Sequence, residues 1–336
     1  MKQRESNIEA LRIVAMMAVI GVHLDGASLD LPVPAGDVAA VSVRDWWRLI
    51  VEALTIIGVN CFTLISGYFG IRASVRGFVR LAGQCLFYGV GICTLAMLLR
   101  VAQGGVWEWM EWGKSWLVFT HTDLWYVPAY LGLFLLSPLL NAGVKGLTQR
   151  QFAAVLAAFV FFNVYGGWLC GGRFNATGYT IMQLIMMYLI GRYLGEYVPL
   201  RGNTLLRRVA VVTYLVASLL TAVIGVYARG TFTFAYNQPL VMVASVALFV
   251  AFATLQFSSQ VVNWLASGAF AAYLLHKNPY VWGGYVRPTA RCLWEDGSLF
   301  EFTLNYILFT VAIYLAATLI DHLRRRLITV KVTTKQ

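Results

Sequence analysis

The chain has 336 residues, of which 59% are hydrophobic and only 12% are charged. A soluble protein carries about 25% charged residues, so this composition excludes a soluble enzyme and favours a chain that crosses a membrane many times. The net charge of +11 would also suit a nucleic-acid-binding protein, but the positions of the basic residues explain it differently, as shown below.

Ten segments are long and apolar enough to cross a bilayer, for which a helix needs about 20 residues. They cover residues 8–24, 47–69, 80–99, 124–141, 152–168, 179–194, 209–227, 239–255, 265–281 and 302–322. Residues 104–123 combine four tryptophans with charged side chains, which is typical of a segment at the membrane surface. The sequence therefore predicts an all-α fold, a polytopic membrane helix bundle of about ten transmembrane helices.

Ten spans put both termini on one side of the membrane, and the positive-inside rule makes that side the cytoplasm. Only nine of the 26 Lys and Arg residues then lie outside: Arg44, Arg48, Arg100, Lys114, Arg173, Arg229, Lys277, Arg287 and Arg291. Most of the positive charge is therefore explained by topology. We expect membrane lipids as partners and no nucleic acid.

The first span carries an arginine and a histidine on one face. Ser6 and Glu9 have the spacing of a capping box, so a helix should begin there. Arg12 and His23 flank an apolar run and are separated by roughly 16 Å along the helix axis, close to the same face. Ionisable residues at membrane depth usually face a cavity or a partner, although both side chains could instead extend to the lipid headgroups.

Two histidines at the outer ends of spans are candidates for a general base. His23 is followed by Asp25, and a nearby carboxylate can fix the tautomer of an imidazole if the helix ends near Leu24. His276 lies at the outer end of the ninth span, in Tyr-Leu-Leu-His-Lys-Asn-Pro. For His276, an ordinary hydrogen bond to a backbone carbonyl is an equally good explanation.

Three arginines lie at the cytoplasmic entrance of the third span. Arg72, Arg76 and Arg80 are spaced four residues apart and would form one stripe on a helix. Together with Arg12 they could hold a phosphorylated cytosolic ligand, because guanidinium groups suit phosphate oxygens. Topology alone is the alternative explanation, since cytoplasmic loops are rich in arginine.

Acetyl-CoA has the shape that such a site requires. It is a phosphorylated nucleotide with a long arm that ends in a thioester, and the extended arm is comparable in length to the distance from Arg12 to His23. If acetyl-CoA lies along this stripe, the surrounding spans must leave a tunnel beside Ala15, Val19 and Val22.

The Arg-x10-His pattern, from Asn-Ile-Glu-Ala-Leu-Arg12 to His23, resembles the first-span motif of acyltransferase family 3. These are integral-membrane acyltransferases that modify cell-surface carbohydrates. Other similar stretches are residues 60–69 of the second span, the arginines of the third, residues 124–138 of the fourth and residues 272–276 of the ninth. The resemblance covers nearly the whole chain.

The resemblance implies a bundle of about ten spans, acetyl-CoA or a related donor, and a glycan or lipid-linked sugar as acceptor. It gives His23 the position of the family's essential histidine and Arg12 that of its partner. The family often has Arg-x-x-Arg at the third span, whereas Arg76 and Arg80 are spaced one residue wider. Which arginines meet the donor is therefore open.

We predict a single integral-membrane acyltransferase domain over residues 1–336, acting as an O-acetyltransferase in the polysaccharide modification of a bacterial inner membrane. The expected donor is acetyl-CoA, the expected acceptor is a carbohydrate, and no metal is expected. The predicted site consists of catalytic His23 and Asp25, donor-binding Arg12, Arg72, Arg76 and Arg80, and acceptor-binding or supporting Ser66, Tyr126 and His276.

His23 would either deprotonate an acceptor hydroxyl or carry the acetyl group transiently. One alternative function is a transporter or flippase for an anionic lipid-linked sugar, although the internal repeats and broken helices of many transporters are not evident. Another is a glycan polymerase, but its arginines would lie mainly in large outer loops, and the outer loops here are short.

Overall fold

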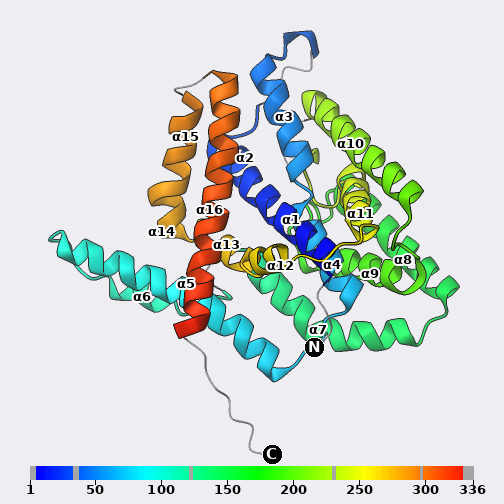
Figure 1. Cartoon of the computed structure of the whole chain (residues 1–336), viewed down its shortest axis with the longest axis horizontal. Helices are drawn as coiled ribbons and strands as arrows, with labels where there is room; N and C mark the ends of the chain where they lie inside the picture. The colour runs from blue at the N-terminus through cyan, green and yellow to red at the C-terminus, as the bar shows by residue number, and fades with distance from the viewer. Residues whose placement is uncertain (1–4, 33–37, 121–123, 229–231, 296–297, 328–336) are drawn as a thin grey trace, which may run out of the picture.

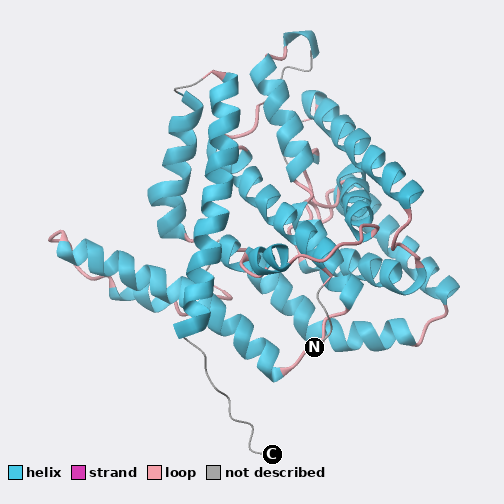
Figure 2. Ribbon diagram, in the orientation of Figure 1, coloured by secondary structure: helices cyan, strands magenta, loops and turns pink. Residues whose placement is uncertain are grey.

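The computed structural model describes residues 5–32, 38–120, 124–228, 232–295 and 298–327. Regular structure in these ranges is helical, and they contain no β-strand (Figure 2). Within them, seven segments are long and apolar enough to cross a membrane: Ser6–Leu29, Val43–Phe69, Val75–Ala102, Tyr126–Lys145, Gln149–Leu169, Thr204–Tyr227 and Leu299–Leu327. The predicted all-α polytopic bundle is confirmed.

The helices follow one another along the chain as Figure 1 shows. The first half contains α1 (Ser6–Leu24), α2 (Gly26–Leu29), α3 (Val43–Thr55), α4 (Gly58–Phe69), α5 (Val75–Ala102), α6 (Trp109–Lys114), α7 (Tyr126–Lys145) and α8 (Gln149–Phe162). The second half contains α9 (Ile181–Tyr197), α10 (Thr204–Tyr227), α11 (Pro239–Ala253), α12 (Gln260–Ala266), α13 (Ala269–His276), α14 (Pro279–Val281), α15 (Arg287–Glu295) and α16 (Leu299–Leu327). Short 3₁₀ and π-helical turns are η1 (Val38–Ala40), η2 (Asn163–Leu169) and η4 (Trp282–Val286).

The ninth expected span is not one helix but three short ones, α12, α13 and α14. The chain bends first at Gly268, where a Cβ atom would lie 2.3 Å from the hydroxyl of Thr318 on α16. It bends again at Asn278, because the residue before a proline is disfavoured in a helix and Pro279 follows. This second bend places His276 at the end of α13, within the bundle, where it is fully buried.

Helix α1 lies in the middle of the bundle (Figure 1), in contact with α3, α4, α11, α12, α13 and α16. One close approach is to α4 at Gly58, where a Cβ atom would come within 2.6 Å of the backbone oxygen of Ala15. Small residues let membrane helices approach closely, and this packing replaces the hydrophobic effect as the source of association in lipid. Helix α1 is therefore held on several sides.

The expected capping box at the start of α1 is wrong. Helix α1 begins at Ser6, but no side chain caps its first turn. The hydroxyl of Ser6 instead donates to Oδ1 of Asn263 at 3.0 Å and accepts from the backbone N–H of Ser259 at 2.9 Å. Glu9 turns toward Arg12, with its carboxylate 3.6 Å from the guanidinium. A contact with α12, distant in sequence, thus takes the place of a local cap.

Candidate active site

A cavity of about 890 Å³ lies among α1, α4, α5, α7, α13 and the end of α16. Its volume falls within the range of about 300–1,000 Å³ that is usual for ligand sites. Five arginines line it: Arg12, Arg76, Arg80, Arg324 and Arg325. We call it the basic cavity.

The basic cavity extends along α1 in the direction of His23. Arg12, Met16 and Val19 line it at successive turns, and His23 continues the same stripe one turn beyond Val19. The lining ends at Tyr126 and Tyr273, and His23 itself is not part of it. The structure thus shows the expected passage up to these two tyrosines rather than an open channel from Arg12 to His23.

Of the three side chains expected beside a tunnel, only one lies there. Val19 lines the basic cavity, whereas Ala15 is fully buried and Val22 is not in the lining. Ala15 faces α4, where its backbone is closest to Gly58. Of these three side chains, Val19 therefore forms part of the cavity wall and the other two do not.

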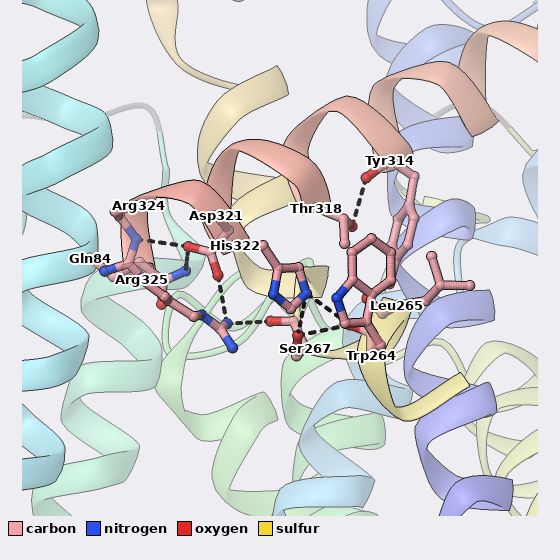
Figure 3. A network of polar contacts seen from close by, with 10 residues as sticks. All are labelled: Gln84, Trp264, Leu265, Ser267, Tyr314, Thr318, Asp321, His322, Arg324 and Arg325. Atoms are coloured by element: carbon pink, nitrogen blue, oxygen red, sulfur yellow. Dashed lines mark hydrogen bonds and ion pairs between the residues drawn. The ribbon is translucent and has the colours of Figure 1, made fainter. Parts of the chain in front are cut away.

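Arg324 and Arg325 come from the last turn of α16, which the sequence had assigned to membrane topology. Both are held by the fully buried carboxylate of Asp321 (Figure 3): its Oδ1 is 2.8 Å from Nε of Arg324, and its Oδ2 is 2.5 Å from Nη2 of Arg325. Gln84 of α5 donates to the same Oδ1 at 3.1 Å. Arg325 also donates to the backbone oxygen of Ser267 at 2.6 Å. One buried carboxylate therefore orients two cations toward the cavity.

The three third-span arginines do not form one stripe. Helix α5 begins at Val75, with the hydroxyl of Ser74 accepting from the N–H of Gly77, so Arg72 precedes the helix. Arg76 and Arg80 line the basic cavity, whereas Arg72 is exposed and is not in the lining. The expectation of a helical stripe is wrong for Arg72, because the chain has not yet entered the helix there.

The chemistry of the basic cavity suits a polyanion. Glu9 is the acidic side chain in its described lining, against five guanidinium groups. The Nε atom of Arg12 is buried and lies 3.6 Å from the carboxylate of Glu9, but it has no hydrogen-bond acceptor among the described residues. A buried unsatisfied donor is unfavourable, so an anionic oxygen at this position would stabilise it. Within the described ranges, no group of three or more His, Cys, Asp or Glu side chains is arranged to hold a metal ion.

His23 and His276 form a hydrogen-bonded pair beside the closed end of the basic cavity. Nδ1 of His23 lies 2.8 Å from Nε2 of His276, and Nδ1 of His276 lies 2.5 Å from the backbone oxygen of Ala272. A carbonyl oxygen only accepts, so Nδ1 of His276 carries its proton and Nε2 carries a lone pair. Nδ1 of His23 is then the donor in the pair, and Nε2 is left as the basic nitrogen of His23.

The ring of His23 is also fixed by an aromatic neighbour. Trp282, the first residue of the π-helical turn η4, meets the imidazole edge-on with ring centroids 6.0 Å apart. The ammonium of Lys277 lies 4.1 Å from the centroid of the Trp282 ring. Single π-helical turns are frequent at functional sites. Hydrogen bonding and ring packing together set the orientation of His23.

Asp25 binds a different partner from the one expected. It is fully buried, and its Oδ1 accepts from Nε of Arg48 on α3 at 2.5 Å. Its Oδ2 has no hydrogen-bond partner among the described residues, so the carboxylate does not bond His23. Arg48 also donates to the backbone oxygen of Asp30 at 2.7 Å. The ion pair of Asp25 and Arg48 thus fixes the chain that follows His23. His276 orients the imidazole of His23 in place of Asp25.

Ser66 and Tyr126 both line the basic cavity. The hydroxyl of Ser66 donates to the backbone oxygen of Phe62, one turn earlier on α4. Tyr126, at the start of α7, stacks on Tyr130 and meets Tyr273 edge-on. The Tyr273 ring centroid lies 6.2 Å from that of His276, so the tyrosines connect the end of the cavity with the histidine pair.

A family model described as an acyltransferase domain, Acyl_transf_3, matches residues 5–322. No curated protein and no solved structure matches the chain. The matched region includes both histidines of the pair, Arg12 and the two arginines of α5. Arg324 and Arg325, which also line the cavity, follow within three residues of its end.

Proposed function

Because the chain belongs to acyltransferase family 3, we propose that it moves an acetyl group from cytosolic acetyl-CoA to a hydroxyl of a cell-surface or lipid-linked carbohydrate. It is a multi-pass membrane acyltransferase. We assign it to the bacterial inner membrane, with the basic cavity facing the cytoplasm according to the positive-inside rule.

The observation that carries the proposal is the arrangement of the basic cavity against the histidine pair. Arginines from three helices line the cavity, and Tyr126 and Tyr273 line it on the side of His276. Coenzyme A has phosphates at one end and a narrow arm that carries the thioester at the other. The phosphates would bind the guanidinium groups, and the arm would follow Met16 and Val19 toward the tyrosines.

The reaction needs a base at the thioester end. Nε2 of His23 takes the proton of the acceptor hydroxyl as the oxygen attacks the thioester carbonyl carbon. The carbon–sulfur bond then breaks, and the proton passes from His23 to the departing thiolate, so that the products are an acetyl ester and free coenzyme A. His276 stays neutral and keeps the imidazolium of His23 oriented through its Nε2.

A second route passes through an acetyl group on His23. Nε2 would attack the thioester itself, and the acceptor oxygen would then take the acetyl group from the imidazole. Both routes use the same nitrogen, and both need the tautomer that His276 sets. Acetyl-CoA consumed without acceptor, in an initial burst equal to the amount of enzyme, would identify the second route.

The proposal is tested with the purified full-length protein in lipid nanodiscs and acetyl-CoA labelled in the acetyl group. We expect release of coenzyme A thiol and transfer of label to lipid-linked saccharides extracted from a bacterial membrane. A transporter of anionic lipid-linked sugars would bind the same saccharides without releasing thiol. Thiol release that equals an empty-nanodisc control would overturn the proposed function.

A further inference from the structure

A second cavity, of about 700 Å³, lies between α5, α6, the start of α7 and the connection from α13 to α14. Its polar lining includes Glu108, Glu111, Lys114, Ser115, Asn278 and Tyr280. We call it the α6 cavity. No step of the reaction described above uses it.

The two cavities follow one another along the same three elements. On α5 the lining passes from Gln84 in the basic cavity to Cys85 in the α6 cavity, and on α7 it passes from Tyr126 to Val127. On α13 it likewise passes from Tyr273 to the next residue, Leu274. The two cavities therefore border one another at these three elements.

The histidine pair lies beside the boundary between the cavities. The ring of Tyr273, at the boundary, is 6.2 Å from the ring of His276, which in turn bonds His23. A group that entered the α6 cavity and reached its inner end would arrive beside the place where the donor arm ends. The two reactants could thus meet from opposite directions.

The α6 cavity differs from the basic cavity in its chemistry. Glu108 and Glu111 supply acceptors for hydroxyl protons, and Ser115 and Asn278 supply groups that donate and accept. The rings of Tyr88 and Tyr280 supply apolar faces. Two carboxylates oppose a phosphate, so this set of groups fits a neutral polyhydroxylated ligand and disfavours a second nucleotide.

The α6 edge of the cavity is exposed. The side chains of Glu108, Glu111 and Lys114 are 39%, 47% and 45% exposed. Glu111 pairs with Lys114 at 2.7 Å, and Glu108 pairs with Arg100. Exposed pairs of this kind contribute little to stability, so a ligand's hydroxyl groups can replace them at small cost.

We propose that the α6 cavity binds the uncharged saccharide part of the acceptor, on the side of the tyrosines opposite to the donor. This inference rests on the proposed function and names the place of its second substrate. The acceptor hydroxyl reaches the boundary at Tyr273, where its proton passes to His23 and its oxygen forms the new ester bond. The donor and the acceptor thus approach the histidine pair through separate cavities.

Two variants test the site by different means. Glu111→Gln removes a carboxylate at the exposed edge, and Val127→Phe fills part of the cavity from α7. Leu135→Phe, at a 61% exposed position of the same helix outside both linings, is the matched control. The acceptor probes are the methyl glycosides of glucose, galactose and rhamnose, and the donor is labelled acetyl-CoA. The KM for donor and for acceptor and the thiol release without acceptor are measured for each protein.

We expect the wild-type protein to acetylate at least one methyl glycoside. For that glycoside, Glu111→Gln and Val127→Phe should each raise the acceptor KM by about tenfold, the first by weakening one polar contact and the second by filling part of the cavity. The donor KM and thiol release without acceptor should stay at the wild-type values, which also shows that the variants are folded. Leu135→Phe should behave as wild type.

The inference is overturned if both variants keep the wild-type acceptor KM, or if the wild type releases thiol but acetylates none of the glycosides. In either case the acyltransferase chemistry stands. Absence of thiol release from the wild type would instead overturn the proposed function itself. The two failures are therefore distinguishable.

Discussion

At the scale of single residues, two hydrogen bonds decide which nitrogen of His23 is basic. The backbone oxygen of Ala272 fixes the proton of His276, and His276 fixes that of His23. A neutral imidazole suits the buried position of His276. A carboxylate without a cationic partner would be unfavourable there, because it would lose its hydration. The carboxylate nearest in sequence, Asp25, is already bound by Arg48.

His276 is a positioning residue, and its removal should lower the turnover number of the enzyme. His276→Ala should reduce kcat by about 10²-fold, within the range that positioned acid–base groups contribute, with the donor KM unchanged. His276→Gln should recover part of kcat, because the amide oxygen can accept from Nδ1 of His23. Steady-state kinetics of both variants provide the measurement. Equal loss of kcat in the two variants would show that His276 only fills space.

The sequence predicted that Arg12 and His23 share one face of α1, but it did not predict the partners of the site residues. Arg12 and His23 followed from helical periodicity, which is a local property. The partner of Asp25 lies on α3, and the partner of His23 lies 253 residues away. Such contacts depend on how the helices pack, and no spacing along the chain encodes them. Arg72 was misplaced for a simpler reason, because the predicted stripe assumed that residue 72 is helical, whereas α5 begins at Val75.

At the scale of helices, the end of α16 contributes to the candidate donor site as much as α5 does. Arg324 and Arg325 line the basic cavity, and Asp321 orients both (Figure 3). A run of arginines after a last span is the usual sign of a cytoplasmic helix end, so the sequence offered no reason to place these two in a cavity. The bend of the chain between α12 and α13 brings Ser267 to Arg325 and completes the cluster.

Neutralising the α16 arginines should weaken donor binding. Arg324→Gln and Arg325→Gln should each raise the acetyl-CoA KM by about ten- to hundredfold, as expected for loss of a charge-assisted hydrogen bond, with the acceptor KM unchanged. Arg326→Gln is the control, because Arg326 is exposed and outside the lining. If all three variants keep the wild-type donor KM, the arginines serve topology alone.

The breaks within the ninth expected span show which helix boundaries the sequence does not predict. Apolar runs of sufficient length identified the seven described helices that are long enough to span a membrane, because length and hydropathy are read directly from the chain. The division of the ninth span into three helices depends on the contact of Gly268 with Thr318 and on Pro279. The proline was visible in the sequence, whereas the contact with α16 required the fold.

At the scale of the whole molecule, the basic cavity should be the path of the pantetheine arm. Gly83 lines it, and a Cβ atom there would meet nothing within 4 Å, so Gly83→Trp can fill the cavity without disturbing the packing. We expect this variant to bind adenosine 3′,5′-bisphosphate, which carries phosphates of the donor head, and to lose acetyl transfer. Gly91→Trp, on the same helix and equally free of neighbours, is the matched control. Normal transfer by Gly83→Trp would place the donor arm elsewhere.

The central claim is that His23, oriented by His276, is the base of an acyl transfer inside the bundle. The most direct measurement compares wild type and His23→Ala in nanodiscs for donor binding and for acetyl transfer to lipid-linked saccharides. We predict that His23→Ala binds acetyl-CoA as wild type does and transfers acetyl about 10²- to 10⁴-fold more slowly. Wild-type transfer rates in a folded His23→Ala protein would contradict the account.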